Sequence, residues 1–117
     1  MPPTLTDRVR HILDAIANIE RVLAGKTAED FAADYLLRLL VERLLEIICE
    51  ASRRVPENVK ASEPGIPWQD MIDFGNRLRH AYHSVDPAIV WEVVTNDLPP
   101  LKAFVERVIR EEQSGRT

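Results

Sequence analysis

The sequence predicts an all-α fold in which four to five helices run up and down in a bundle. Apolar residues recur at intervals of three and four along almost the whole chain, as they do on one face of a helix. No stretch alternates apolar and polar residues as a half-buried β-strand would. Proline and glycine gather in short stretches that separate the helical segments. The length of 117 residues, 45% of them apolar, predicts one domain over residues 1–117.

The first helix is expected to begin after Thr6, which can act as its N-cap. It is expected to end at Ala24, because Gly25 follows and glycine is favoured just beyond a helix C-terminus. One apolar stripe runs along this segment and predicts the face that packs in the core: Val9, Ile12, Leu13, Ile16, Ile19 and Leu23.

The second helix is expected to run without a break from Thr27 to about Val55, where Pro56 follows. Thr27 and Asp30 have the spacing of a capping box. The middle of this helix, "YLLRLLVERLLEIIC", is apolar on more than one face, so we expect it to be buried on two sides. A bundle of this size achieves such burial more easily as part of a homodimer.

The rest of the chain predicts a loop and three further helices. The segment "PENVKASEPGIP" is rich in proline and glycine and is expected to be a loop. Pro67 suits the first turn of a third helix, which we expect to cover residues 68–83. The dipeptide "DP" at 86–87 predicts an N-cap and a first-turn proline of a short fourth helix, and "ND" at 96–97 opens the last helix. The tail "REEQSGRT" is expected to fray.

Composition excludes several classes of protein. A net charge of −4 and a pI of about 5.4 argue against broad electrostatic binding to nucleic acid, although a local basic cleft stays open. The single cysteine, Cys49, excludes an internal disulfide and an all-cysteine metal site, and we expect it to be a small buried residue. No signal-peptide-like stretch and no apolar run of roughly 18 residues occurs, so we expect a cytoplasmic protein without membrane association.

The third predicted helix carries the residues most suggestive of chemistry. Positions three and four apart share a helix face. Five polar or charged residues therefore fall near one another: Asp73, Asn76, Arg77, His80 and His83. An imidazole, with an ordinary pKa of about 6.5, can take a proton from a hydroxyl at neutral pH. A guanidinium can hold a phosphate and stabilise charge that develops on it.

Together these groups could cleave RNA without a metal or another cofactor. The base would deprotonate a ribose 2′-hydroxyl, and this requirement would exclude DNA as a substrate. Residue types and spacing alone favour a solvated helix face over a catalytic site. A metal site at His80 and His83 is disfavoured, because the usual ligand spacings and a third well-placed ligand are lacking.

Three segments make the chain resemble a known family. They are "GKTAEDF" after the first helix, "LEIICEASRRV" from Leu45 to Val55, and "IPWQDMIDFGNRLRHAYHSVDPAIVWEVVTNDLPPLK" from Ile66. The last block resembles the signature block of the HepT-like toxins of the HEPN superfamily. The matching positions within it are Trp68, Asn76, His80, Tyr82, Val85, Asp86 and Trp91.

The resemblance implies a helical HEPN bundle, commonly a homodimer whose motif helices face a shared cleft. It implies a metal-independent RNase toxin and a cognate nucleotidyltransferase antitoxin of the MntA (MNT) type. The family motif is an arginine, four to six further residues, and then His-x-Tyr. His80 would therefore be the base, and Tyr82 would be the tyrosine to which the antitoxin attaches AMP.

The arginine is where this chain departs from the motif, because position 75 holds Gly75. At about 100° per residue, Arg77 lies about 60° from His80 on a helix, and Arg79 lies about 100° away. Either Arg77 or Arg79 replaces the missing arginine, or the chain has lost catalysis and keeps only a surface for the antitoxin. A glycine at this position either permits close backbone contact across a dimer interface or reflects sequence drift alone.

Overall fold

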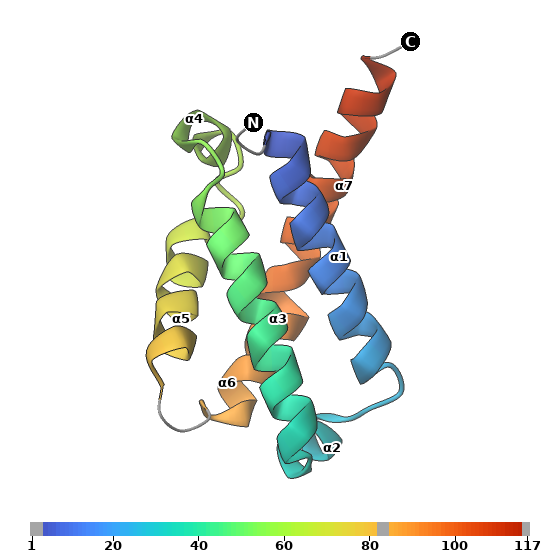
Figure 1. Ribbon diagram of the computed structural model, residues 1–117, viewed down its shortest axis with the longest axis vertical. Coiled ribbons are helices and arrows are strands. Elements are labelled where there is room, and N and C mark those ends of the chain that lie inside the picture. The colour runs from blue at the N-terminus through green and yellow to red at the C-terminus, as the bar shows by residue number, and fades with distance from the viewer. Residues whose placement is uncertain (1–3, 82–84, 116–117) are drawn as a thin grey trace.

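The computed structural model describes residues 4–81 and 85–115, and these residues form a bundle of helices without a β-strand among them (Figure 1). The prediction of an all-α fold is confirmed. A π-helical turn, Val93–Asp97, joins the last two α-helices. The α-helices are α1 (Leu5–Leu23), α2 (Ala28–Ala33), α3 (Tyr35–Arg53), α4 (Glu57–Ala61), α5 (Trp68–His80), α6 (Pro87–Glu92) and α7 (Leu98–Ser114).

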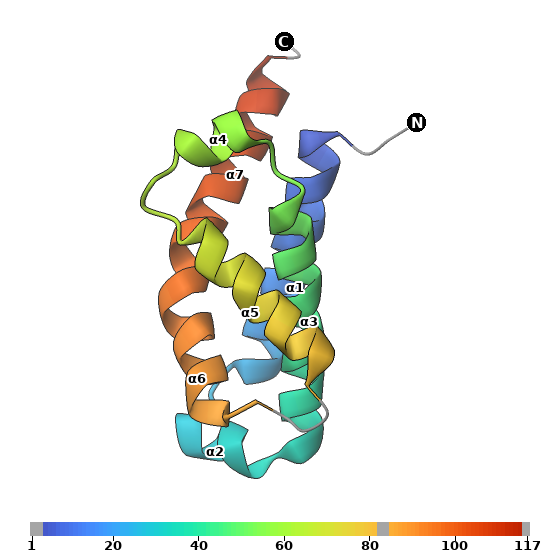
Figure 2. The same ribbon diagram turned by 90° about the vertical axis from the view of Figure 1, so that its left-hand side faces the viewer.

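Four long helices, α1, α3, α5 and α7, build the body of the bundle. The most extensive contacts join α1 to α3, α3 to α5, and α1 to α7. Figure 1 shows α3 in front, between α5 and α1, with α7 behind them. Helix α3 runs opposite to both α1 and α5, and α5 crosses the bundle obliquely (Figure 2). The start of α1 therefore lies beside the end of α3.

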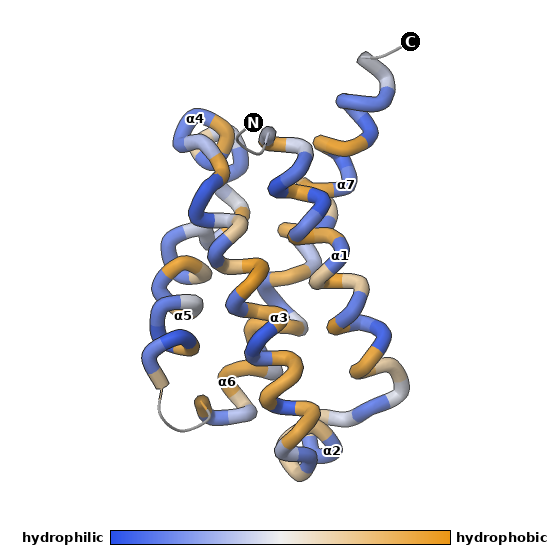
Figure 3. Tube along the Cα trace, in the orientation of Figure 1, coloured by the Kyte–Doolittle hydropathy of each residue, from blue (hydrophilic) through white to orange (hydrophobic). Residues whose placement is uncertain are grey.

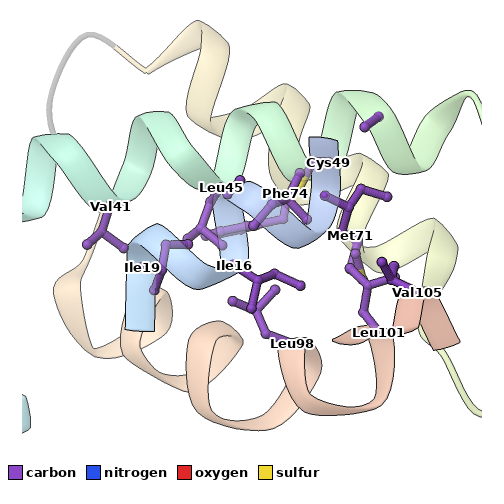
Figure 4. Close-up of a cluster of buried hydrophobic side chains, with 14 of the residues drawn as sticks. Ile16, Ile19, Val41, Leu45, Cys49, Met71, Phe74, Leu98, Leu101 and Val105 are labelled. Carbon is purple, nitrogen blue, oxygen red and sulfur yellow. The ribbon is translucent and has the colours of Figure 1, made fainter. Parts of the chain in front are cut away.

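All four long helices contribute to one hydrophobic core. Their apolar stripes point toward one another, as Figure 4 shows for Ile16 of α1, Leu45 of α3, Phe74 of α5 and Leu101 of α7. Trp68 packs edge-on against Phe104 with ring centroids 5.5 Å apart, which anchors the start of α5 to α7. Since each side chain comes from a segment distant in sequence, the core fixes the relative positions of the helices.

Several predicted helix ends agree with the structure. Thr27 caps α2 through the predicted box, in which its hydroxyl accepts from the Asp30 N–H and the Asp30 carboxylate accepts from the Thr27 N–H. Gly25 follows α1 with a φ of 75°, in the left-handed region that glycine adopts freely. At the other end of α1 the N-cap is Thr4, so the prediction of Thr6 was wrong by two residues.

The unbroken helix predicted from Thr27 to Val55 was wrong at one residue, Asp34. Its backbone is extended, with φ −106° and ψ 98°, and it ends α2. Its carboxylate accepts from the Leu37 N–H at 3.1 Å and so caps the start of α3. The chain therefore turns between α2 and α3 without a proline or a glycine.

Two further expectations about local structure were wrong. The predicted loop after Pro56 contains the short helix α4. The tail was expected to fray from Arg110, yet α7 remains helical as far as Ser114. An ion pair between Arg10 of α1 and Glu112 of α7, at 3.7 Å, ties this end to the bundle. Among the described residues, no helix is long and apolar enough to cross a membrane.

The start of α3 leaves an apolar patch uncovered by the rest of the chain. Its members are exposed on the outer face of the helix: Tyr35 (57%), Leu36 (75%), Leu39 (40%) and Leu40 (44%). We call these four residues the α3 patch. In Figure 3 the half of α3 next to α2 is coloured mainly as hydrophobic. Burial of α3 on two sides is therefore not achieved within one copy of the chain.

Gly75 lies where α5 packs closely against α3. A Cβ atom built on Gly75 would lie 2.5 Å from the Cβ of Cys49, far inside van der Waals contact. Cys49 is buried at 3% exposure, as predicted. The close contact suggested for a dimer interface is thus found inside the chain, where the missing side chain lets one helix rest directly on the other.

This contact predicts that Gly75→Ala destabilises the protein. Overpacking costs about 1–3 kcal/mol, and a contact as short as 2.5 Å belongs to the upper half of that range, about 2–3 kcal/mol, whereas alanine gains only about 1 kcal/mol over glycine in a helix. We expect the free energy of unfolding in urea to fall by about 1–2 kcal/mol. The control is Gly65→Ala, because nothing lies within 4 Å of a Cβ there, and it should change stability by no more than about 0.5 kcal/mol. A Gly75→Ala protein as stable as the native chain would contradict the contact.

Candidate functional site

The predicted motif residues lie along the second half of α5. This helix begins at Trp68, after Pro67, and His80 is its last residue. The backbone of Ala81 is extended, so the helix ends at His80, and the expectation of an unbroken helix over residues 68–83 was wrong at Ala81. The predicted site residues Tyr82 and His83 lie outside the described residues.

Asn76 and Arg79 form one polar cluster on α5. The Arg79 guanidinium donates to the Asn76 side-chain oxygen at 2.6 Å and lies 3.7 Å from the Glu50 carboxylate of α3. Arg79 is thereby held against α3, and its charge is partly balanced. A guanidinium held by Asn76 and Glu50 is less available to bind a phosphate beside His80 than a guanidinium without such partners.

The other predicted residues of α5 lie on a neighbouring face that points to solvent. Asp73, Arg77 and His80 are all exposed. Asp73 accepts a hydrogen bond from Gln69 at 2.9 Å, whereas Arg77 has no hydrogen bond or ion pair with any described residue. The structure thus divides the predicted set: Asn76 and Arg79 turn toward α3, and Asp73, Arg77 and His80 stay on the open side of α5.

Asn76 and Arg79 line a cleft of about 440 Å³ that lies over the outer face of α3. Helices α1 and α5 form its two sides. We call it the α3 cleft. Its basic residues are Arg8 and His11 of α1, Arg43, Arg53 and Arg54 of α3 and its end, and Arg79 of α5. Two carboxylates, Glu46 and Glu50, also line it.

The α3 cleft carries an excess of positive charge. Five arginines face two glutamates, an excess of three positive charges with the histidine neutral, in a chain of net charge −4. Glu46 pairs with Arg43 at 2.8 Å, and Glu50 pairs with Arg54 at 3.2 Å. Arg8 and Arg53 have no ion pair with any residue that the structure describes. A local basic cleft in an acidic protein is therefore present, and it is suited to an anion.

Cys49 lies under the α3 cleft, beneath Gly75. Burial raises the pKa of its thiol to about 12. The thiol therefore stays protonated near neutral pH and is a poor nucleophile. Within residues 4–81 and 85–115, no three His, Cys, Asp or Glu side chains come together as a possible metal site.

The sequence analysis missed the α1 and α3 members of the cleft. Arg8 and His11 are three residues apart and share a helix face, and this pairing was available as a signal. Nothing local indicated that this face would meet Arg53, more than forty residues further along the chain. The meeting depends on the opposite directions of α1 and α3 (Figure 1).

Comparison with known proteins supports a single family. The family described as Ribonuclease HepT-like matches this chain over residues 12–108. A probable ribonuclease HepT of Thermococcus cleftensis is 38% identical over 102 residues, which cover 87% of this chain and 93% of that protein. A protein of Methanocaldococcus jannaschii described as a putative RNase is 37% identical over 79 residues, covering 68% and 72% of the two chains.

A third relative, a putative RNase of Caldanaerobacter subterraneus, is 29% identical over 105 residues, covering 90% of this chain and 94% of that protein. No solved structure matches the chain. The family match covers most of α1 and all of α5, including His80, and it begins just after the cleft residues Arg8 and His11. The chain therefore belongs to the HepT-like ribonuclease family of the HEPN superfamily.

Proposed function

We propose that this protein is a metal-independent endoribonuclease of the HepT-like toxin type, with His80 as general base. The observation that carries the proposal is an exposed histidine at the end of α5, next to a basic cleft in an otherwise acidic chain. The names of its relatives, a probable ribonuclease HepT and putative RNases, support the same activity.

The proposed reaction uses groups of the chain alone. The neutral His80 imidazole takes the proton of a ribose 2′-hydroxyl, and the 2′-oxygen attacks the adjacent phosphorus. A guanidinium stabilises the negative charge of the phosphorane. The bond from phosphorus to the 5′-oxygen then breaks, and the leaving oxygen takes up a proton. The products are a 2′,3′-cyclic phosphate and a 5′-hydroxyl.

We propose that the guanidinium of Arg77 stabilises the phosphorane. It shares the open side of α5 with His80 and is not engaged by any described residue, whereas Arg79 is held by Asn76 and Glu50. Asn76 and Arg79 are then positioning residues that shape the approach of the substrate, and Asp73 supports the polar face. His83 stays a possible further member of this site.

The test is digestion of RNA in the presence of EDTA. His80→Ala should lose about 10²-fold or more of the cleavage rate, as expected for a general base. Arg77→Ala should lose more than Arg79→Ala, because only Arg77 is proposed to touch the phosphorane. The control is Arg110→Ala, an exposed arginine on α7 away from α5. Cleavage that survives His80→Ala, or that stops when the metal is removed, would contradict the mechanism.

A second candidate function rests on Gly75. The arginine of the family motif is absent there, and Cys49 occupies the space that its Cβ would need. On this alternative the chain is a catalytically silent HEPN module whose role is to bind a nucleotidyltransferase antitoxin. A native protein without cleavage activity that still forms a complex with such a partner would favour this candidate over the first.

Modification of Tyr82 is the proposed means of control by an MNT-type antitoxin. Attached AMP would add bulk and negative charge beside His80, in a site meant for a phosphate, and would inhibit by blockage and repulsion. Incubation with ATP and a candidate MNT-type nucleotidyltransferase should add the mass of one AMP in intact mass spectrometry. The added mass should be absent from Tyr82→Phe. An added mass that persists in Tyr82→Phe would show that Tyr82 is not the site of modification.

We also propose that the protein is a homodimer joined through the α3 patch. Arg38 and Glu42 flank the patch, and each has a buried atom, Nε and Oε2 respectively, without a hydrogen bond to a described residue. Burial raises the pKa of Glu42, and the positive charge of Arg38 one turn earlier on the same helix partly opposes this shift. A two-fold axis would place Arg38 of each copy against Glu42 of the other, so the surface is complementary to itself.

The dimer predicts that charge in the α3 patch separates the copies. Leu36→Glu and Leu40→Glu should each lower the mass measured by light scattering from that of a dimer to that of a monomer. Both residues are exposed in a single copy, so the fold should survive. The control is Ala17→Glu, at an exposed position of α1. A native protein that is monomeric at micromolar concentration would overturn the proposal.

A further inference from the structure

The α3 cleft offers two arginines that the fold leaves without a carboxylate. Arg8 on α1 and Arg53 at the end of α3 have no ion pair with any residue in the described part of the chain. The other arginines are held by Glu46 or Glu50. A cleft in which some arginines are anchored and others are free has both a fixed shape and charge available for an external anion.

The cleft is longer than one phosphate group requires. Arg43 and Arg53 both line it, and ten residues of an α-helix span about 15 Å. Ile47 and Ile72 add apolar surface between these charges. His11 supplies an aromatic ring on which a base can stack. Charges spread along a groove, with apolar side chains between them, suit a chain of phosphates carrying bases better than an isolated anion.

From these features we infer that the α3 cleft binds the phosphate backbone of single-stranded RNA, with Arg8 and Arg53 as its main contacts. A volume of about 440 Å³ is in the range of pockets that hold one small molecule, so it admits a nucleotide of an unpaired strand. The identity of the ligand as RNA rests on the proposed function.

The position of the cleft relates this binding to the proposed cleavage at His80. Its α5 side includes Asn76 and Arg79, and Arg79 directly precedes His80 in the chain. A strand held along α3 therefore leaves the cleft beside the residue proposed to start cleavage. Arg8, His11 and Arg53 come from helices outside the family motif, so they select and hold the strand while α5 performs the chemistry.

The experiment measures binding in the His80→Ala protein, so that the strand is not cut. The probe is a fluorescently labelled, mixed-sequence oligoribonucleotide, followed by anisotropy at several salt concentrations. Arg8→Ala and Arg53→Ala, each added to His80→Ala, should weaken binding about tenfold. Each should also reduce the slope of log K against log salt by about 0.7, the value for one lost contact with a single strand.

Arg110→Ala in the same background is the matched control and should bind as its parent does. Both cleft arginines are on the surface of helices, and circular dichroism melting will verify that each variant is folded. Unchanged binding after removal of both Arg8 and Arg53 would overturn the inference. An equal loss in the Arg110→Ala variant, or tighter binding of an oligodeoxyribonucleotide of the same sequence, would also overturn it.

The two proposals fail in different ways. If the native protein does not cut RNA but the oligoribonucleotide still binds through Arg8 and Arg53, the proposed function fails and the cleft inference stands. If cutting requires His80 but neither cutting nor binding depends on Arg8 or Arg53, the cleft inference fails and the proposed function stands.

Discussion

The arrangement of the site depends on the contact between Gly75 of α5 and Cys49 of α3. Gly75 contributes no side chain there, so the backbone of α5 rests directly on the small side chain of Cys49. Met71 and Phe74 then reach the core on one side of α5, while Asn76 and Arg79 face the outer surface of α3 on the other. The Glu50 carboxylate meets Arg79 because of this approach. A larger residue at position 75 would move α5 away from α3, and with it Arg79 away from Glu50.

The same contact explains why this chain cannot carry, in its present packing, the arginine that the motif resemblance implies at position 75. The first atom of any side chain there would collide with Cys49, whose own backbone is held within α3. Positive charge is instead supplied by arginines on three helices around the α3 cleft and by Arg77 on the open side of α5. Under the two proposals, arginines of α1 and α3 bind the RNA backbone, and residues of α5 cleave its phosphodiester bond.

Helix α3 presents two kinds of surface along one outer face. Its first half bears the apolar α3 patch, and its second half bears the charged floor of the α3 cleft, with the change between Leu40 and Arg43. The break at Asp34 sets where this helix begins, and therefore which residues share that face. An interface and a binding cleft can thus lie on one helix without competing for the same residues.

The sequence by itself determined the helical class, the capping box at Thr27, the turn at Gly25 and the start of α5 after Pro67. These features depend on the 3.6-residue period and on hydrogen bonds between near neighbours, so local residues specify them. It also indicated Asn76, Arg77, Arg79 and His80, because they share one helix. Only the tertiary structure decided which of these residues line a cleft, that α2 and α3 separate at Asp34, and that Gly75 fits Cys49. The tertiary structure alone brought Arg8 and Arg53 to the same cleft. Such proximity between distant segments depends on how whole helices pack and in which direction they run.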